Sequence, residues 1–322
     1  MRNISASEID AALDFPALIE ALHEAFRGGF VAPARHHHAI ERPGEAAATH
    51  LLMPAWTSAA AGADAFLGTK LVNVFPGNGA RGLPAVLGLY VLQSGLTGEP
   101  LATMDGTCLT HWRTAAASAL AASFLARADS SRLLIVGAGA LAPYLVRAHA
   151  SVRPIRSVAV WNHRREGATR LAAALGAQGF EARAVDDLER AVGEADIVSC
   201  ATLSTEPLIK GAWLRKGQHL DLVGAFTMGM READDVALKR ARVFVDTPAA
   251  LTEGGDVALA LAGGAIARSD LVADLAALCG GAPGRGAADE ITLFKSVGAS
   301  IEDLAAAMLV QARTAPLTRA PS

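Results

Sequence analysis

A glycine-rich turn near the middle of the chain constrains the fold more than any other feature. The apolar run LLIV at 133–136 leads into GAGALA at 137–142, a GxGxxA pattern, and a helical segment follows. In such a turn the first glycine permits a tight bend, the second lets the backbone approach a pyrophosphate, and the small last residue lets helix and strand pack closely. The pattern predicts a dinucleotide-binding strand–turn–helix unit, with a bare structural turn as the alternative.

Strand-like and helical segments alternate from Arg132 onward. SVAVWN, DIVSCAT, HLDLVGAF and RVFVDT are strand-like, and helical stretches such as EGATRLAAALGAQG lie between them. This alternation favours a parallel sheet with helices on both faces. We therefore expect an α/β fold in which a Rossmann-type, doubly wound parallel sheet domain occupies residues 119–299.

The N-terminal part of the chain has a different pattern. Ser5 and Glu8 form a capping-box pair for a short helix, and a second helix begins at Asp14 and ends before Gly28. THLLMPAW, FLGTKLVNVF and PAVLGLYVLQ are strand-like, and GLTGEP predicts a hairpin turn. These segments predict a smaller α+β domain with an antiparallel sheet, and SIEDLAAAMLVQAR predicts an amphipathic helix near the end of the chain.

Composition excludes several classes of partner. The chain has 322 residues, with 29 basic and 32 acidic side chains and a net charge of −3, so nothing drives it towards nucleic acid or an anionic membrane. The N-terminus lacks the apolar stretch of a secretory signal, and the run at 133–146 is too short to span a bilayer. We expect a cytoplasmic protein with a small-molecule ligand.

Cysteine and histidine spacing predicts no metal site. Cys108, Cys200 and Cys279 are far apart, which argues against a disulfide framework and a cysteine zinc site. For Cys108 a packed, inert thiol is favoured over a reactive one. His36 and His38 would share one face of a strand; a solvated strand end is favoured, and a proton donor or metal ligand is the alternative.

The residues after the second strand of the parallel sheet select the cofactor. An NAD enzyme usually places an acid there to bind the ribose hydroxyls. Here Asn162 is followed by His163, Arg164 and Arg165, and no acid occurs before Glu166. Two arginines can hold a 2′-phosphate by charge-assisted hydrogen bonds. We predict NADPH, with NADH possible, and a solvated basic turn as the alternative.

Cations in the smaller domain predict a carboxylate site. THWRTAAAS looks like a helix start capped by Thr110, which would put Arg113 in the first turn, where the helix dipole disfavours a cation. A bound anion would explain the arginine. Lys70 lies in a strand-like run, where an inward lysine needs a partner, and Arg35 could supply a third cation. The alternative for Lys70 is a surface position on an edge strand.

Several motifs resemble the ornithine cyclodeaminase/mu-crystallin family, over nearly the whole chain. The matching segments are GTKLVNVFPGN, GLPAVLGLYVL, TGEPLATMDGTCLTHWRTAAASALAA, VGAGALA, ADIVSCAT, GQHLDLVGA, EGGD and ITLFKSVGASIEDLAAA. The resemblance implies a homodimer, a substrate-binding and dimerisation domain formed by 1–118 plus 300–322, and a carboxylate-binding trio of Arg35, Lys70 and Arg113. The predicted cofactor-binding residues are Gly137, Gly139, Ala140, Leu141, Asn162, Arg164, Arg165, Thr202, Ser296 and Gly298.

The same resemblance bears on the reaction. Cyclodeaminases of the family carry an aspartate in a Gly-Ala-Asp stretch, where this chain has Gly224, Ala225 and Phe226. Phenylalanine cannot accept a proton, but it can pack against the methylenes of a closed ring. The run LDLVGAFTMGMREADD resembles the branch that reduces cyclic imines, and we judge the nearby Asp221 to be structural.

We therefore expect NADPH-dependent reduction of Δ1-pyrroline-2-carboxylate and Δ1-piperideine-2-carboxylate to L-proline and L-pipecolate. Lys70 would bind the carboxylate or relay the proton. The alternatives are ornithine cyclodeaminase, an alanine dehydrogenase-like activity, and a non-enzymatic NADPH-binding protein of the mu-crystallin type. Asp289 and Glu290 are expected to cap a helix rather than to act in catalysis.

Overall fold

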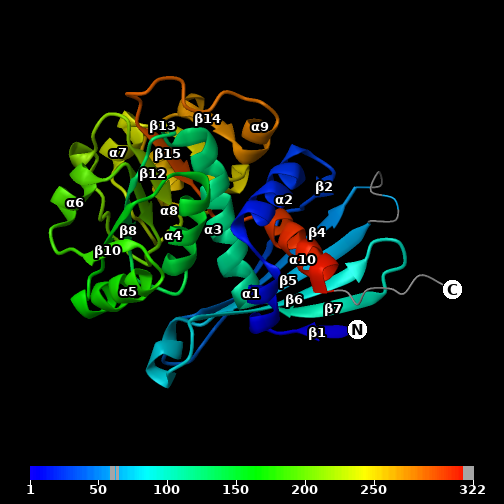
Figure 1. The fold of residues 1–322 in the computed structure, drawn as a ribbon. Helices are drawn as coiled ribbons and strands as arrows, with labels where there is room; N and C mark the ends of the chain where they lie inside the picture. The colour runs from blue at the N-terminus through cyan, green and yellow to red at the C-terminus, as the bar shows by residue number, and fades with distance from the viewer. Residues whose placement is uncertain (59–61, 63–64, 315–322) are drawn as a thin grey trace. The chain divides into compact units, whose positions relative to one another are not determined.

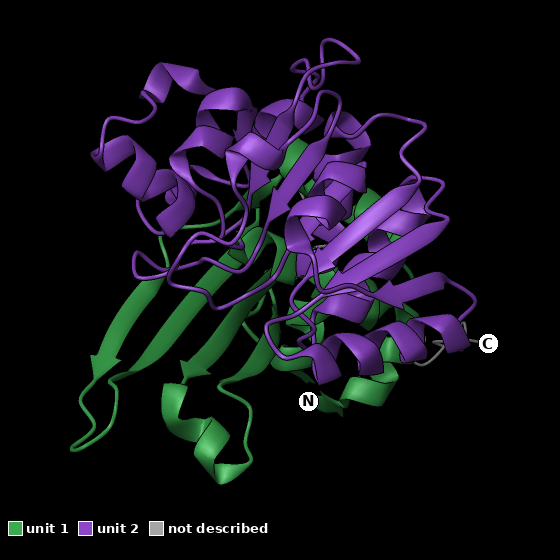
Figure 2. Ribbon diagram, turned by 90° about the vertical axis from the view of Figure 1, so that its left-hand side faces the viewer, with its two compact units in different colours: residues 1–113, 299–322 green, residues 114–298 purple. Residues whose placement is uncertain are grey.

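The chain forms two compact units. The structure, a computed structural model, describes residues 1–58, 62 and 65–314. The first unit consists of Met1–Arg113 and Ala299–Ser322, and the second of Thr114–Gly298 (Figure 2). The sequence-based division lies at 118/119 and 299/300, and the roles that it gives to the two parts remain a proposal.

Within the described residues, the first unit is built on a seven-stranded sheet of order β1-β7-β6-β5-β4-β2, with β3 paired to β4. Its pairs are antiparallel except β1 with β7, and the turn GLTGEP joins β6 to β7 as predicted. The strands are β1 (Arg2–Ile4), β2 (Phe30–Val31), β3 (His36–Ile40), β4 (Ala48–Thr57), β5 (Phe66–Val74), β6 (Val86–Ser94) and β7 (Pro100–Asp105). A short 3-10 helix, η2 (Pro76–Arg81), follows β5.

One face of this sheet is covered by helices. α10 (Ser300–Thr314) packs on β4 and β5, and both α1 (Ala6–Ala12) and α2 (Phe15–Arg27) pack against α10 (Figure 1). The capping box of Ser5 and Glu8 is present, and Asp14 caps α2 by accepting from the backbone N–H of Ala17. The predicted caps of these two N-terminal helices are thus confirmed.

The predicted start of the next helix was wrong. α3 (Gly106–Leu125) begins before Thr110, because Asp105 accepts a hydrogen bond from the backbone N–H of Cys108 and so takes the capping position. The Thr110 hydroxyl instead donates to the carbonyl of Gly106 inside the helix. Arg113 therefore lies beyond the first two turns, and the dipole at the helix start does not explain it.

The second unit, all of whose residues are described, contains an eight-stranded sheet of order β10-β9-β8-β11-β12-β15-β13-β14. All its pairs are parallel, which confirms the predicted α/β class. The strands are β8 (Arg132–Val136), β9 (Ser157–Trp161), β10 (Glu181–Ala184), β11 (Ile197–Cys200), β12 (His219–Leu222), β13 (Arg242–Val245), β14 (Leu271–Asp274) and β15 (Thr292–Lys295). Chain order reverses where β8 meets β11, as in Rossmann folds.

Helices connect these strands. They are α4 (Ala142–Val152), α5 (Arg165–Ala177), α6 (Leu188–Glu194), α7 (Asp235–Arg240), α8 (Gly255–Ala262) and α9 (Leu275–Cys279), with 3-10 turns η3 (Gly211–Trp213), η4 (Pro248–Leu251) and η5 (Arg268–Asp270). Asp289 and Glu290 precede a strand, β15, so their predicted role as a helix cap was wrong; they pair with Lys216 and Arg242. No helix in the described ranges is long and apolar enough to cross a membrane.

Two arginines hold the C-terminal end of α3, and both the arginines and this part of the helix belong to the second unit. Nη2 of Arg153 donates to the carbonyls of Ala122, Ser123 and Ala126, at 2.8, 2.8 and 2.9 Å, and Nε of Arg285 donates to the carbonyl of Leu125. The last carbonyls of a helix have no partner within it and carry partial negative charge, so cations stabilise them.

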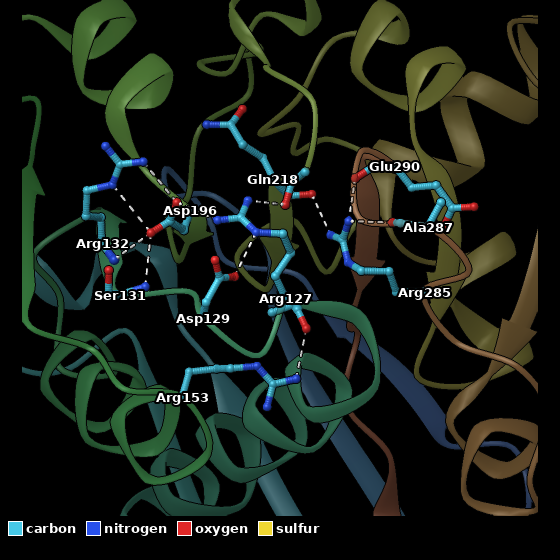
Figure 3. Close-up of polar contacts among 12 residues, drawn as sticks. Arg127, Asp129, Ser131, Arg132, Arg153, Asp196, Gln218, Arg285, Ala287 and Glu290 are labelled. Carbon is cyan, nitrogen blue, oxygen red and sulfur yellow. Dashed lines mark hydrogen bonds and ion pairs between the residues drawn. The ribbon is translucent and has the colours of Figure 1, made fainter.

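Asp196 fixes the amino end of β8 in the same region (Figure 3). It accepts from the backbone N–H groups of Ser131 and Arg132 and from the side chains of Arg127 and Arg132. Burial raises the pKa of this carboxyl, but these hydrogen bonds outweigh it and lower the pKa to about 2.

We predict that Arg153→Ala lowers the free energy of unfolding by about 2 kcal/mol, because it removes charged hydrogen bonds to three helix-end carbonyls. Urea denaturation of the purified protein measures the change. Arg190→Ala is the control, since Arg190 makes only an exposed pair with Glu194 on α6 and should cost less than about 0.5 kcal/mol. Equal effects of the two substitutions would show that α3 does not need this anchor.

Candidate active site

A cavity of about 340 Å³ opens at the carboxyl ends of β8, β9 and β11 in the second unit. Ligands of open α/β sheets bind at the point where strand order reverses, and this cavity lies there. Its lining residues are Gly137, Ala138, Gly139, Trp161, Asn162, His163, Ala201, Thr202, Leu203, Ser204 and Leu208.

The glycine turn forms part of the cavity lining. Gly137 has φ 105°, and a Cβ there would lie 2.6 Å from the carbonyl oxygen of Ala201, so only glycine fits. A Cβ on Gly139 would meet nothing within 4 Å, which leaves open space for a phosphate. Leu141, the residue before α4, makes no side-chain capping hydrogen bond, and the positive end of the α4 dipole lies at this turn, where it favours an anion. These features fit a dinucleotide pyrophosphate.

Asn162 ties the glycine turn to the segment after β9. Its Oδ1 accepts from the backbone N–H of Ala138 at 3.2 Å, and its Nδ2 donates to the carbonyl of Arg164 at 2.8 Å. Arg165 forms an exposed ion pair with Asp186. These two hydrogen bonds fix the Asn162 side chain, and the basic residues come directly after it in the chain. One of them, His163, lines the cavity.

The structure brings together some of the predicted cofactor residues. Gly137, Gly139, Asn162 and Thr202 line the cavity, whereas Ala140, Leu141, Arg164 and Arg165 are its neighbours in sequence. Ser296 and Gly298 follow β15 and donate to Oδ2 of Asp246. Seven lining residues were not predicted, although each lies in the glycine turn or ends or follows a predicted strand: Ala138, Trp161, His163, Ala201, Leu203, Ser204 and Leu208.

A cluster of buried charges lies in the first unit. Lys70 on β5 and Arg113 on α3 meet two acids of α10, Glu302 and Asp303, and all four side chains are buried. One oxygen of Asp303, Oδ1, lies 2.8 Å from Nζ of Lys70 and 3.0 Å from Nε of Arg113. Nη1 of Arg113 lies 2.6 Å from Oε2 of Glu302. Two positive and two negative charges thus compensate each other out of water.

Burial changes the acidity of groups in this cluster. Loss of solvent, followed by repulsion from Arg113, outweighs the attraction of Asp303 and lowers the pKa of Lys70 to about 8. Tyr90, which pairs with Lys70 across strands β5 and β6, is fully buried, and burial and then Asp303 raise its pKa. Among the described residues the Tyr90 hydroxyl has no hydrogen-bond partner. Lys70 is therefore the group of this cluster that is suited to move a proton near neutral pH.

Sequence reasoning found the cations but missed Glu302, Asp303 and Tyr90. The signal for the two acids was their place in the first turn of the otherwise apolar segment SIEDLAAAMLV. Arg35, the third predicted cation, is partly exposed and lies directly before β3. Phe226 is partly buried in the loop after β12.

Other residues singled out by sequence have structural surroundings. Asp221 is fully buried and accepts from the hydroxyls of Ser118 and Ser199, with His149 also in contact. Cys108 is buried, 3.6 Å from the carbonyl of Ala6. His36 and His38 are exposed on one face of β3, with ring centroids 6.4 Å apart.

A parallel sheet that reverses its order at a glycine turn, with a cavity at that point, defines a Rossmann-type dinucleotide-binding protein. The chain belongs to the ornithine cyclodeaminase/mu-crystallin family, whose model matches residues 4–316. The resemblance inferred from the motifs is confirmed.

Three similar proteins have a named activity. The chain is 46% identical over 240 residues to a Δ1-pyrroline-2-carboxylate reductase of Paracoccus denitrificans, covering 74% of this chain and 76% of the relative. The structure of Thermococcus litoralis Δ1-pyrroline-2-carboxylate reductase with NADH and L-proline matches with a TM-score of 0.92 at 33% identity, over 97% of both chains. An archaeal alanine dehydrogenase dimer with bound NAD matches with a TM-score of 0.89 at 31% identity, over 97% of this chain and 95% of that chain.

Proposed function

We propose that the protein is an NADPH-dependent reductase of cyclic imino acids, converting Δ1-pyrroline-2-carboxylate and Δ1-piperideine-2-carboxylate to L-proline and L-pipecolate. The observation that carries the proposal is the buried pair of Lys70 and Arg113, both in contact with one carboxylate oxygen. Both cations can therefore share a single carboxylate, as the binding of an α-imino acid requires. Relatives named for this reaction add support.

Arg113 anchors the substrate carboxylate in this proposal, and Arg35 is the third cation that the family resemblance assigns to it. A planar guanidinium offers five N–H donors, and the contacts with α10 involve its Nε and Nη1 atoms. Glu302 and Asp303 orient the guanidinium and keep it charged. The bound dinucleotide supplies the hydride for C2 of the imine.

Lys70 holds or moves the proton of the ring nitrogen. An imine accepts hydride more readily when its nitrogen is protonated, and an acid whose pKa lies near the working pH transfers protons best. With its pKa lowered to about 8, the ammonium of Lys70 is a better proton donor than an ordinary lysine.

Phe226 favours reduction over cyclodeamination. It follows Gly224 and Ala225 after β12, where family cyclodeaminases carry an aspartate, and it cannot bind an amine or accept a proton. Its ring can pack on the methylenes of a cyclic substrate.

The segment after β9 favours NADPH over NADH. No acid stands at that strand end before Glu166, and Arg164 and Arg165 supply positive charge for a 2′-phosphate. The pair of Arg165 with Asp186 is exposed and therefore contributes at most about 1 kcal/mol, which a phosphate can replace.

The purified protein should oxidise NADPH with Δ1-piperideine-2-carboxylate or Δ1-pyrroline-2-carboxylate, and should do so faster than NADH at equal low concentration. Absorbance of the reduced nicotinamide follows the reaction. Ammonia release from ornithine alone would support a cyclodeaminase, reduction of pyruvate with ammonia would support an alanine dehydrogenase, and NADPH binding without turnover would support a binding protein.

The matched variant for this assay is Arg113→Ala. Loss of the carboxylate anchor should lower kcat/KM, and the decrease should correspond to a loss of at least about 2 kcal/mol of transition-state stabilisation. Near-normal turnover by a folded variant would show that the carboxylate binds elsewhere.

A basic limb in the pH profile should report Lys70. Because its pKa is lowered from 10.5 to about 8, the ammonium loses its proton as the pH rises through about 8, and kcat/KM should fall above that pH. Lys70→Arg stays protonated and should remove this limb from the residual activity. Ionisation of the substrate is the same for both proteins, so an unchanged limb in the variant would exclude Lys70 as the proton donor.

We also propose a homodimer formed through the sheet of the first unit. The uncovered face carries apolar side chains that pair across three strands, Leu52 with Leu71 and Leu71 with Leu89. Trp56 and Leu89 are 38% and 42% exposed. Contiguous exposed apolar patches mark association surfaces, and a structural relative is described as a dimer.

Leu89→Lys should convert the dimer to a monomer, because it places a charge in the proposed interface. Size-exclusion chromatography with light scattering measures the mass. Val236→Lys, at an exposed apolar residue on α7, is the control and should remain dimeric. A monomeric wild-type protein, or an unaffected Leu89→Lys variant, would refute this interface.

A further inference from the structure

Two loops that follow adjacent strands approach each other closely beside the dinucleotide cavity. Thr202 follows β11 and lines the cavity, and Gly224 follows β12, the neighbouring strand. A Cβ on Gly224 would lie 2.1 Å from the carbonyl oxygen of Thr202 and 2.5 Å from Oε1 of Glu232. Only glycine therefore permits this approach, and Glu232 lies at the point of contact.

The carboxylate of Glu232 joins the two loops. Its Oε1 accepts from the backbone N–H and the hydroxyl of Thr202 at 2.7 and 2.8 Å. Its Oε2 accepts from the backbone N–H groups of Gly224 and Ala225 at 2.8 and 3.3 Å. Four donors converge on one fully buried side chain, and only an ionised carboxylate can accept from all of them.

Charged groups surround Glu232 on several elements. Oδ1 of Asp256 on α8 accepts from the backbone N–H of Glu232, and Nζ of Lys295 on β15 lies 3.1 Å from Oδ2 of Asp256. Cys200 on β11 is a buried thiol near these charges. With all three ionisable side chains charged, two acids face one lysine, so the backbone N–H groups supply the remaining stabilisation of Glu232.

We propose that Glu232 is a positioning residue for the dinucleotide, whose carboxylate holds Thr202 against the cavity and fixes the Gly224–Ala225 turn that presents Phe226. The inference rests on the proposed function only in that the second unit binds a nicotinamide dinucleotide. Glu232 is fully buried and acts through Thr202 and the turn, not by contact with the reacting atoms.

Protonation of Glu232 would weaken the hydrogen bonds by which its carboxylate joins the two loops. Burial raises the pKa of Glu232, and Asp256 raises it further, while Lys295 and the hydrogen bonds of Thr202 lower it, with a result of about 7. Above that pH Glu232 is ionised and can accept all four hydrogen bonds. Dinucleotide affinity should therefore fall as the pH drops through 7. The sign for folding is the opposite: a raised carboxyl pKa makes the folded state less stable as the pH rises from 4.5 to about 7.

The test compares NADH binding by the full-length wild-type protein, Glu232→Gln and Asp196→Asn, using calorimetry. NADH is used because it lacks a 2′-phosphate that would titrate. Glu232→Gln is isosteric but turns an amide donor towards backbone N–H groups, and it should weaken binding at least about tenfold. Asp196→Asn removes a carboxylate that accepts backbone N–H groups at the amino end of β8, whereas the cavity lies at the carboxyl end of that strand, so it should lower the Tm and leave the Kd unchanged.

Each outcome decides one question. An unchanged Kd for folded Glu232→Gln, in a protein whose wild type binds NADH, would overturn the positioning role alone. Failure of the wild type to bind NADH or NADPH would overturn the proposed function. Glu232→Asp, which keeps the charge, should bind more tightly than Glu232→Gln, whereas a merely structural role would lower the Tm of both without changing the Kd.

If Glu232→Gln does not fold, a pH titration of NADH binding decides instead. His163 also lines the cavity, so the titration uses a His163→Gln background in which no imidazole can titrate there. Affinity that falls about tenfold between pH 8 and pH 6 supports the role of Glu232, and affinity independent of pH over that range overturns it.

Discussion

Compensation of buried charge in the first unit is the constraint on which the candidate site depends. Lys70 and Arg113 are almost completely shielded from water, and a buried cation without a partner is unstable. Their partners, Glu302 and Asp303, lie in the first turn of α10. The chain therefore has to leave the parallel sheet and return to the first unit before these cations can be held. The same requirement explains why one carboxylate oxygen of Asp303 lies within reach of both cations.

The second unit uses carboxylates in a comparable way, but mainly to hold backbone. Glu232, Asp246 and Asp196 each accept from two or more backbone N–H groups at the ends of strands. At the amino end of β8 the effect of Asp196 is to anchor that strand, and at the carboxyl ends the effect is to shape the loops around the cavity. Buried acids at the carboxyl ends are thus close to function even where they touch no ligand, because a parallel sheet gathers its loops at that edge.

Much of the fold follows from local patterns. The alternation of strands and helices, the glycine turn and the caps of α1 and α2 depend on neighbouring residues, and these predictions are confirmed. Helix starts were less secure where two caps competed, since Asp105 and Thr110 both precede apolar helical sequence and the aspartate took the capping position. Asp289 and Glu290 were misread because an acidic pair before an apolar run can precede a strand as well as a helix.

The sequence by itself determined the family and the α/β class, and it singled out Lys70 and Arg113 as cations that need partners. Motifs and periodicity are carried by residues close together in the chain, so they can be recognised without the structure. Tertiary structure decided what those cations meet: Asp303 lies 233 residues from Lys70, and Glu302 lies 189 from Arg113. It also decided that Glu232 joins two loops through a space that only Gly224 leaves open. Such pairings depend on how the sheets bring distant segments together, and no local pattern encodes a contact between residues so far apart.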